Sequence, residues 1–147
     1  MRCLQVIYKH ETEWDKNMDY SKQLDNYKKQ SVYSMTQGEM LMLLYDELLK
    51  RLKRSKIRLQ KEDYENFEAD MTRAKEIVRY LRKILNMSYP ISSELSRLYT
   101  FYESHMSRIM ASRKSTQIDE LIPMIEDLKE AFYEADIKTK GLSSDIV

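Results

Sequence analysis

Glycine and proline are almost absent from this chain, which contains only 2 of each in 147 residues. These residue types form most tight turns and break helices and strands, so their scarcity predicts long uninterrupted elements joined by short connections. Leu, Met, Lys, Glu and Arg are abundant, whereas β-branched residues are fewer, and this balance favours helix over strand. The sequence therefore predicts an all-α fold.

The charges nearly cancel, because 25 Lys and Arg stand against 24 Asp and Glu. A dedicated nucleic-acid binder usually has a basic excess, which this chain lacks. Cys3 is the single cysteine, which excludes an internal disulfide framework and fits a reducing cytosol. The apolar runs are shorter than the roughly 20 residues that span a membrane, and the N-terminus does not resemble a signal peptide. We therefore expect a cytoplasmic protein that does not insert into membranes.

The two ends of the chain differ in pattern from its middle. Residues 1–19 show no sustained hydrophobic period and are predicted to be a flexible N-terminal tail. Residues 20–33 are weakly amphipathic, so we expect an N-terminal segment packed along the helices. A helical bundle is predicted over residues 20–137. Residues 138–147 are predicted to be a flexible C-terminal tail, because the pattern dissolves there.

A capping box marks the start of the first long helix. Thr36 can accept a bond from a free backbone N–H, and Glu39, three residues on, can reach back to the cap. The helix is predicted to run to about Gln60. One stripe follows the three-and-four spacing of a helix face: Leu41, Leu44, Tyr45, Leu48, Leu52 and Leu59. Further apolar residues lie outside this stripe: Met40, Met42, Leu43 and Leu49.

The next helix is predicted from about Asp63 to Asn86. It carries a bundle seam with alternating spacings of four and three: Phe67, Met71, Ala74, Val78, Leu81 and Leu85. It also carries a second apolar stripe: Ile77, Tyr80, Ile84 and Met87. One seam is enough to join a bundle, so the second stripe is apolar surface in excess.

Two more helices are predicted in the second half. Pro90 is expected to end the connection and Ser92 to cap a helix with inward Leu95, Leu98, Tyr99, Tyr102, Met106 and Ile109. Thr116 and Asp119 open the last helix, which carries Ile118, Leu121, Ile125, Leu128, Phe132 and Ala135. Pro123 is expected to kink that helix or delay its start. Short connections make neighbours antiparallel, so the sequence predicts an antiparallel bundle of four to five helices.

Residues that carry chemistry are missing. His10 and His105 are the only histidines, and neither follows a Glu by three residues, as a di-iron bundle site requires. One cysteine with two distant histidines does not make a zinc site. The sequence has neither a glycine-rich phosphate loop nor a nucleophile elbow. We expect no catalytic residue, no metal and no cofactor.

A basic run covers residues 50–61 and could contact phosphates. The same cations suit the C-terminal end of a helix, and the near-zero net charge favours this plainer interpretation. The last helix has an acidic face that can lie near the basic run: Asp119, Glu120, Glu126, Asp127 and Glu130.

The apolar excess on two helices points to a partner. Exposed patches of this kind usually mark interaction sites, and a groove between helices commonly accepts an amphipathic helix. The alternative is that the N-terminal segment covers the excess within the same chain.

Three short segments resemble the N-terminal signature of the FliS family: residues 27–32, 36–41 and 44–46. The likeness extends through the helices to about Ala135. Gly38 stands where the family usually has proline, Glu47 and Leu48 stand where it often has Gly-Ala, and the first 17 residues have no match.

This resemblance implies a cytoplasmic chaperone that binds the disordered C-terminal segment of flagellin, prevents its premature polymerisation and assists its export. It implies that Tyr27 and Val32 form a lid over a groove with Leu41, Leu44 and Tyr45. We add Leu48, Ile77, Tyr80 and Ile84 to this predicted partner-binding set. Two alternatives are an adaptor for another partner, such as a regulatory protein, in the flagellar export system and a small nucleic-acid-binding helical protein.

Overall fold

The structure is a computed structural model, and it describes the backbone of residues 36–146 and the side chains of residues 36–138. The described part is built from four α-helices: α5 (Gln37–Gln60), α6 (Tyr64–Lys83), α7 (Pro90–Ser112) and α8 (Ser115–Ile146). This confirms the predicted all-α fold. The segment predicted over residues 20–33, with Tyr27 and Val32, lies outside the described residues.

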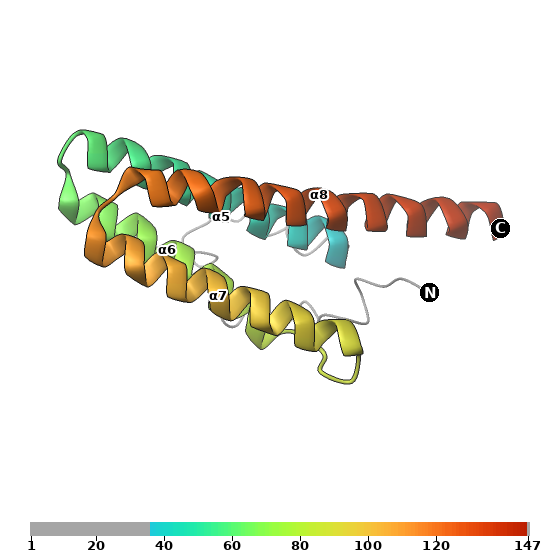
Figure 1. The fold of residues 1–147 in the computed structure, drawn as a ribbon. Helices are drawn as coiled ribbons and strands as arrows, with labels where there is room; N and C mark the ends of the chain where they lie inside the picture. The colour runs from blue at the N-terminus through green and yellow to red at the C-terminus, as the bar shows by residue number, and fades with distance from the viewer. Residues whose placement is uncertain (1–35, 147) are drawn as a thin grey trace, which may run out of the picture.

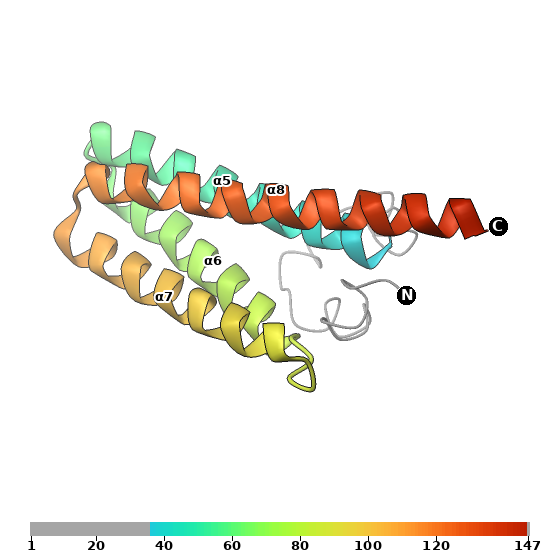
Figure 2. The same cartoon turned by 45° about the vertical axis from the view of Figure 1, so that its right-hand side comes forward.

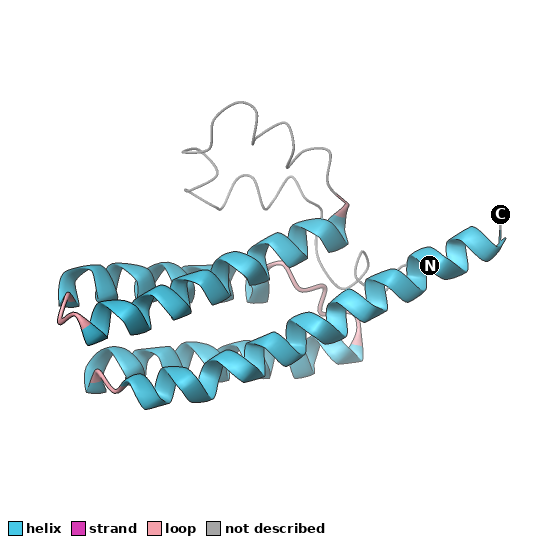
Figure 3. Ribbon diagram, turned by 90° about the horizontal axis from the view of Figure 1, so that it is seen from above, coloured by secondary structure: helices cyan, strands magenta, loops and turns pink. Residues whose placement is uncertain are grey.

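The four helices form an antiparallel bundle (Figures 1 and 2). Each helix packs beside its neighbour in the chain, and α5 also packs along α8. In Figure 3 the described elements are helices joined by short loops. Helix α8 is the longest, at 32 residues, and extends past the end of the bundle.

The capping box predicted before α5 is present. The Glu39 backbone N–H donates to Thr36 Oγ1 at 3.1 Å, and the Thr36 N–H donates to Glu39 Oε2 at 3.4 Å. Two backbone donors that the first helical turn leaves free are thereby bonded.

The start of α7 differs from the prediction. Pro90 is the first residue of the helix, where its missing N–H leaves no hydrogen bond unmade and its fixed φ suits a helix. Ser92 lies inside the helix and is buried, and its hydroxyl donates to the carbonyl of Asn86 at 2.6 Å. Helix α6 ends at Lys83, before the predicted Asn86.

The length of α8 also differs from the prediction. It starts at Ser115 and continues through Pro123, so the proline does not delay its start. The predicted tail over residues 138–147 is helical as far as Ile146. An apolar stripe marks only the part of a helix that packs, whereas backbone hydrogen bonding can carry the helix further.

The core runs along the centre of the bundle and contains three tyrosines, Tyr45, Tyr99 and Tyr102, among its largest fully buried side chains. The ring of Tyr45 on α5 stacks on Phe132 of α8, with centroids 5.9 Å apart. The seam predicted on α6 is buried throughout: Phe67, Met71, Ala74, Val78, Leu81 and, just beyond the helix, Leu85. Burial of such side chains from water is the main term that stabilises the fold.

The Asp136 carboxylate of α8 lies very close to Gly38 of α5. A Cβ atom at this position would lie 2.7 Å from Asp136 Oδ2 and would also collide with the other carboxylate atoms. The Asp136 carboxylate thus lies beside the first turn of α5, where the helix dipole favours a negative charge. The absence of a side chain at Gly38 makes this approach possible.

Candidate partner-binding site

The predicted groove residues of the described part form the interior. The seven residues are at most 4% exposed: Leu41, Leu44, Tyr45, Leu48, Ile77, Tyr80 and Ile84. In this form of the protein a partner reaches them only if the covering chain moves. Their role in partner binding stays a prediction.

Tyr45 connects helix α5 to helix α7 through the interior of the bundle. Its hydroxyl lies 2.5 Å from the hydroxyl of Tyr99, so the two are hydrogen bonded. Tyr102 lies next to Tyr99 in the core, with ring centroids 6.3 Å apart. Burial, with the nearby charge of Asp127, raises the pKa of Tyr102 to about 12. This phenol therefore stays neutral at physiological pH and is suited to packing rather than to proton transfer.

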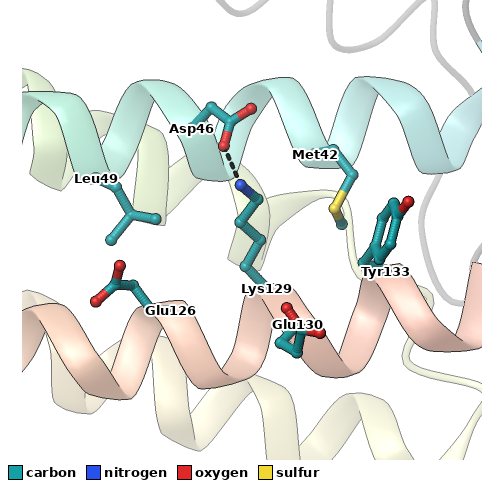
Figure 4. Close-up of a pocket in the computed structure, with 7 residues that line it drawn as sticks. All are labelled: Met42, Asp46, Leu49, Glu126, Lys129, Glu130 and Tyr133. Carbon is teal, nitrogen blue, oxygen red and sulfur yellow. Dashed lines mark hydrogen bonds and ion pairs between the residues drawn. The ribbon is translucent and has the colours of Figure 1, made fainter.

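An open groove lies on the surface between α5 and α8 (Figure 4). Its volume is about 390 Å³. We call it the α5–α8 groove, and its lining residues are Met42, Asp46, Leu49, Glu126, Lys129, Glu130 and Tyr133.

The lining combines apolar side chains with a charged pair. Met42 and Leu49 are two helical turns apart on α5 and share one face. Tyr133 is 50% exposed and lies at the Met42 end of the groove. Lys129 forms an ion pair with Asp46 that joins the two helices (Figure 4). Such a surface can hold apolar side chains of another segment and align its polar groups.

Sequence reasoning found only part of this groove. Met42 and Leu49 were recognised as apolar residues outside the main α5 stripe, but Lys129 and Tyr133 were not singled out. A usable signal was present on α8, where residues 126, 130, 133 and 137 repeat at helical spacing away from the buried stripe.

The basic run on α5 is largely engaged in ion pairs within the bundle. Arg51 Nη1 lies 3.0 Å from Oδ1 of the buried Asp70 on α6. Arg54 and Arg58 approach Oδ2 of the same carboxylate at 3.9 and 3.7 Å. These contacts neutralise much of a surface that could otherwise attract phosphates.

The other side of α5 meets the acidic face of α8, as the sequence predicts. Lys53 Nζ lies 3.6 Å from Glu126 Oε2, and Lys56 Nζ lies 2.8 Å from Asp119 Oδ1. These pairs are partly exposed, so each stabilises the fold by about 0–1 kcal/mol. Their main effect is to set the register between the two helices.

Within the described residues, no cluster of three or more His, Cys, Asp or Glu side chains could hold a metal ion. Over the same part of the chain, the helices are too short or too polar to cross a membrane.

Comparison with known proteins gives a family match and a curated relative. Residues 20–139 match the family model described as "Flagellar protein FliS". The relative is the "Flagellar secretion chaperone FliS" of Bacillus subtilis (strain 168). It is 21% identical over 109 residues, which cover 74% of this chain and 82% of the relative.

Proposed function

Since this chain belongs to the FliS family of flagellar proteins, we propose that it is a cytoplasmic flagellar secretion chaperone whose cargo is flagellin. It binds the disordered C-terminal segment of flagellin, prevents premature polymerisation and assists export. It acts by binding rather than by catalysis and requires no cofactor.

The observation that supports this function best is the α5–α8 groove. It lies between two long helices and presents Met42 and Tyr133, with the buried Leu49 at its base, beside charged groups. A groove of this kind matches the way in which an amphipathic helix docks on a helical protein. Methionine suits such a surface because its flexible thioether adapts to different apolar shapes.

The cargo segment becomes helical when it binds. Ordering a disordered segment costs conformational entropy, and burial of its apolar residues against the groove offsets that cost. The charged side chains of Asp46 and Lys129 lie in the middle of the groove, so the bound helix passes over this pair or replaces it.

The proposed lid is a separate part of this function. We retain Tyr27 and Val32 as residues that cover apolar surface before cargo arrives. We also retain Leu41, Leu44, Tyr45 and Leu48, with Ile77, Tyr80 and Ile84, as residues that such a movement exposes or that support the groove from below.

The test uses the full chain and a peptide of the flagellin C-terminal segment from the same genome. We expect a one-to-one complex by calorimetry, a gain in helical circular dichroism and a higher melting temperature of the chaperone. Absence of all three signals at peptide concentrations of tens of micromolar, an order-of-magnitude ceiling for a useful contact, contradicts the function.

Variants then test the groove. Met42→Ser and Tyr133→Ser together should weaken binding about tenfold or more, because they remove apolar contact area from the lining. Ile57→Ser is the matched control, since Ile57 is an exposed apolar residue of α5 that does not line the groove. Equal effects of the groove pair and the control would place the cargo elsewhere on the bundle.

A nucleic-acid role has less support. The basic run faces carboxylates of α6 and α8 at short distance, as described above. An adaptor role for another export partner differs from the proposed function only in the partner. The flagellin titration separates the two.

A further inference from the structure

A second apolar surface lies on the opposite side of α8, towards α7. Of the helix pairs that adjoin in the bundle, α7 and α8 approach each other least closely. Figures 1 and 2 show them diverging from their shared turn. Near that turn they are joined by a hydrogen bond between His105 Nε2 and the carbonyl oxygen of Gln117, 3.1 Å long.

The α8 side of this surface follows a coiled-coil pattern. Spacings of four and three residues place one apolar line along the helix: Met124, Leu128 and Ala131. Gln117 lies seven residues before Met124, so the line shares the face that bonds to α7. Met124 is 38% exposed and Leu128 is partly exposed, so α7 does not cover this line.

The α7 side carries a matching line. Ile91, Leu98, Phe101 and His105 are separated by seven, three and four residues. The ring of Phe101 lies against His105, with centroids 5.7 Å apart, and His105 faces α8. Phe101 is 40% exposed and Ile91 is 53% exposed. The two lines together define what we call the α7–α8 face.

Acidic residues flank this face at a regular interval. Glu120, Asp127 and Glu134 follow one another at every seventh position of α8, next to the apolar line and on its outer side. All three are exposed. The effect of Asp127 on the buried Tyr102 of α7 agrees with this placement.

These acids differ from those on the other side of α8. Asp119 and Glu126 are paired with lysines of α5. No ion pair within the described residues involves Glu120, Asp127 or Glu134. The face therefore combines the exposed apolar side chains of Ile91, Phe101 and Met124 with a line of carboxylates that have no cationic partner among the described residues.

We propose that the α7–α8 face binds an amphipathic helix that carries Lys or Arg along the flank next to α8. The apolar stripe of this partner packs on Phe101, Met124 and Leu128, and its cations pair with Glu120, Asp127 and Glu134. From Met124 to Ala131 the line has a length of about 10 Å, which corresponds to about two helical turns of the partner.

The charges also determine the direction of the partner helix. Reversing a helix on this face exchanges its left and right flanks, so only one direction brings a basic flank against α8. Flanking charges set partner choice and orientation in coiled coils by the same principle. The face lies on the opposite side of α8 from the α5–α8 groove, so both surfaces can be occupied at once.

The test uses the full chain and two designed 21-residue helical peptides with leucine at the core heptad positions. One peptide carries lysine on a single flank, and the other carries glutamate there. We expect the lysine peptide to bind more tightly than the glutamate peptide, with an affinity that falls as salt concentration rises. Equal affinity of the two peptides overturns the proposal.

Variants of the chaperone locate the site. Asp127→Lys should weaken binding of the lysine peptide about fivefold. Glu65→Lys makes the same charge change at an exposed position of α6 and should leave the affinity for the lysine peptide within about twofold of the native value. Phe101→Ser with Met124→Ser should weaken binding about tenfold or more. Retained affinity in this double variant, with helicity confirmed by circular dichroism, overturns the proposal.

Analytical ultracentrifugation of the free protein tests one competing occupant. We expect the same sedimentation for the native chain and for Phe101→Ser. A dimer that Phe101→Ser dissociates would assign the face to a second copy of this chain and overturn the proposal. Failure of the flagellin peptide to bind does not affect this test, because the designed peptides probe a different surface.

Discussion

The hydroxyl groups of Tyr45 and Tyr99 lie 2.5 Å apart and connect two helices that do not adjoin. Helix α5 packs beside α6 and α8, and α7 also packs beside α6 and α8, so this hydrogen bond crosses the bundle diagonally. A polar link in the middle of an apolar core favours one arrangement of the four helices, because other registers separate its two hydroxyls.

A double-mutant cycle measures this link. Tyr45→Phe or Tyr99→Phe should each reduce the free energy of unfolding by about 0.5–1.5 kcal/mol, since each removes the hydrogen bond and little packing. The double variant should lose less than the sum of the two single losses, because both remove the same bond. Additive losses in urea unfolding would show that the hydroxyls are not coupled.

Gly38→Ala should stabilise the protein less than this change usually does in a helix. Alanine is normally favoured over glycine in a helix by about 0.5–1 kcal/mol. Here its methyl group meets the Asp136 carboxylate. We expect Gly38→Ala to raise the melting temperature more in an Asp136→Ser background than in the native background. An equal shift in both backgrounds would contradict the close approach.

Asp70→Asn should reduce the free energy of unfolding by about 1.5–3 kcal/mol, because a charge-assisted bond to Arg51 is replaced by a weaker one in a buried position. Asp119→Asn is the matched control at the exposed pair with Lys56, and it should cost about 0–1 kcal/mol. Similar losses of unfolding free energy for Asp70→Asn and Asp119→Asn in urea would show that the buried pair stabilises the fold no more than the exposed pair.

Asp63 caps α6, because its Oδ1 accepts a bond from the backbone N–H of Asn66 at 3.4 Å, and this cap should make stability depend on pH in the acidic range. The side-chain amide of Asn66 donates to Asp63 Oδ2 at 2.7 Å and lowers the pKa of Asp63 below its ordinary value of 3.8. A lowered pKa means that the stabilisation is present above pH 3.8 and is lost as the pH falls through the lower folded value.

Asp63→Asn tests this contribution, since Asn also caps helices well but does not ionise. We expect the melting temperature of Asp63→Asn to fall less than that of the native protein below about pH 4. Asp63→Ala should lower the melting temperature at neutral pH as well, because the helix cap is lost. Parallel pH profiles for the native protein and Asp63→Asn would exclude the proposed role of the carboxylate.

Much of the fold could be predicted because its signals are local. The capping box of Thr36 and Glu39 and the seam from Phe67 to Leu85 depend only on neighbours within a few turns. The pairing of Lys53 and Lys56 with α8 could be anticipated because a basic and an acidic block are easily recognised in the sequence.

The second stripe shows where this reasoning reaches its limit. Ile77 and Tyr80 looked like excess surface, yet they are buried. A helix in a bundle touches two neighbours and buries more than one stripe, and the sequence of a single helix does not reveal how many neighbours it has. The α5–α8 groove combines residues from distant parts of the chain, such as Met42 and Tyr133, so its shape depends on the register of two helices.

The order in which the helices pack has a consequence for folding kinetics. The α5–α6, α6–α7 and α7–α8 pairs form between neighbours in the chain, whereas docking of α8 on α5 closes a loop that contains the two helices between them. Loop closure costs chain entropy before its contacts repay it, and α7 and α8 pack together only loosely, so we expect the α5–α6 and α6–α7 hairpins to form early and α8 to dock late. Helix α8 packs less closely on its two neighbours taken together than α6 packs on α5 and α7, so α8 should detach first in the native state, and its backbone amides should then exchange with solvent faster than those of α6. Such an opening uncovers Tyr45 and Phe132 while the α5–α6 hairpin stays intact, which gives a chaperone access to additional apolar surface without global unfolding.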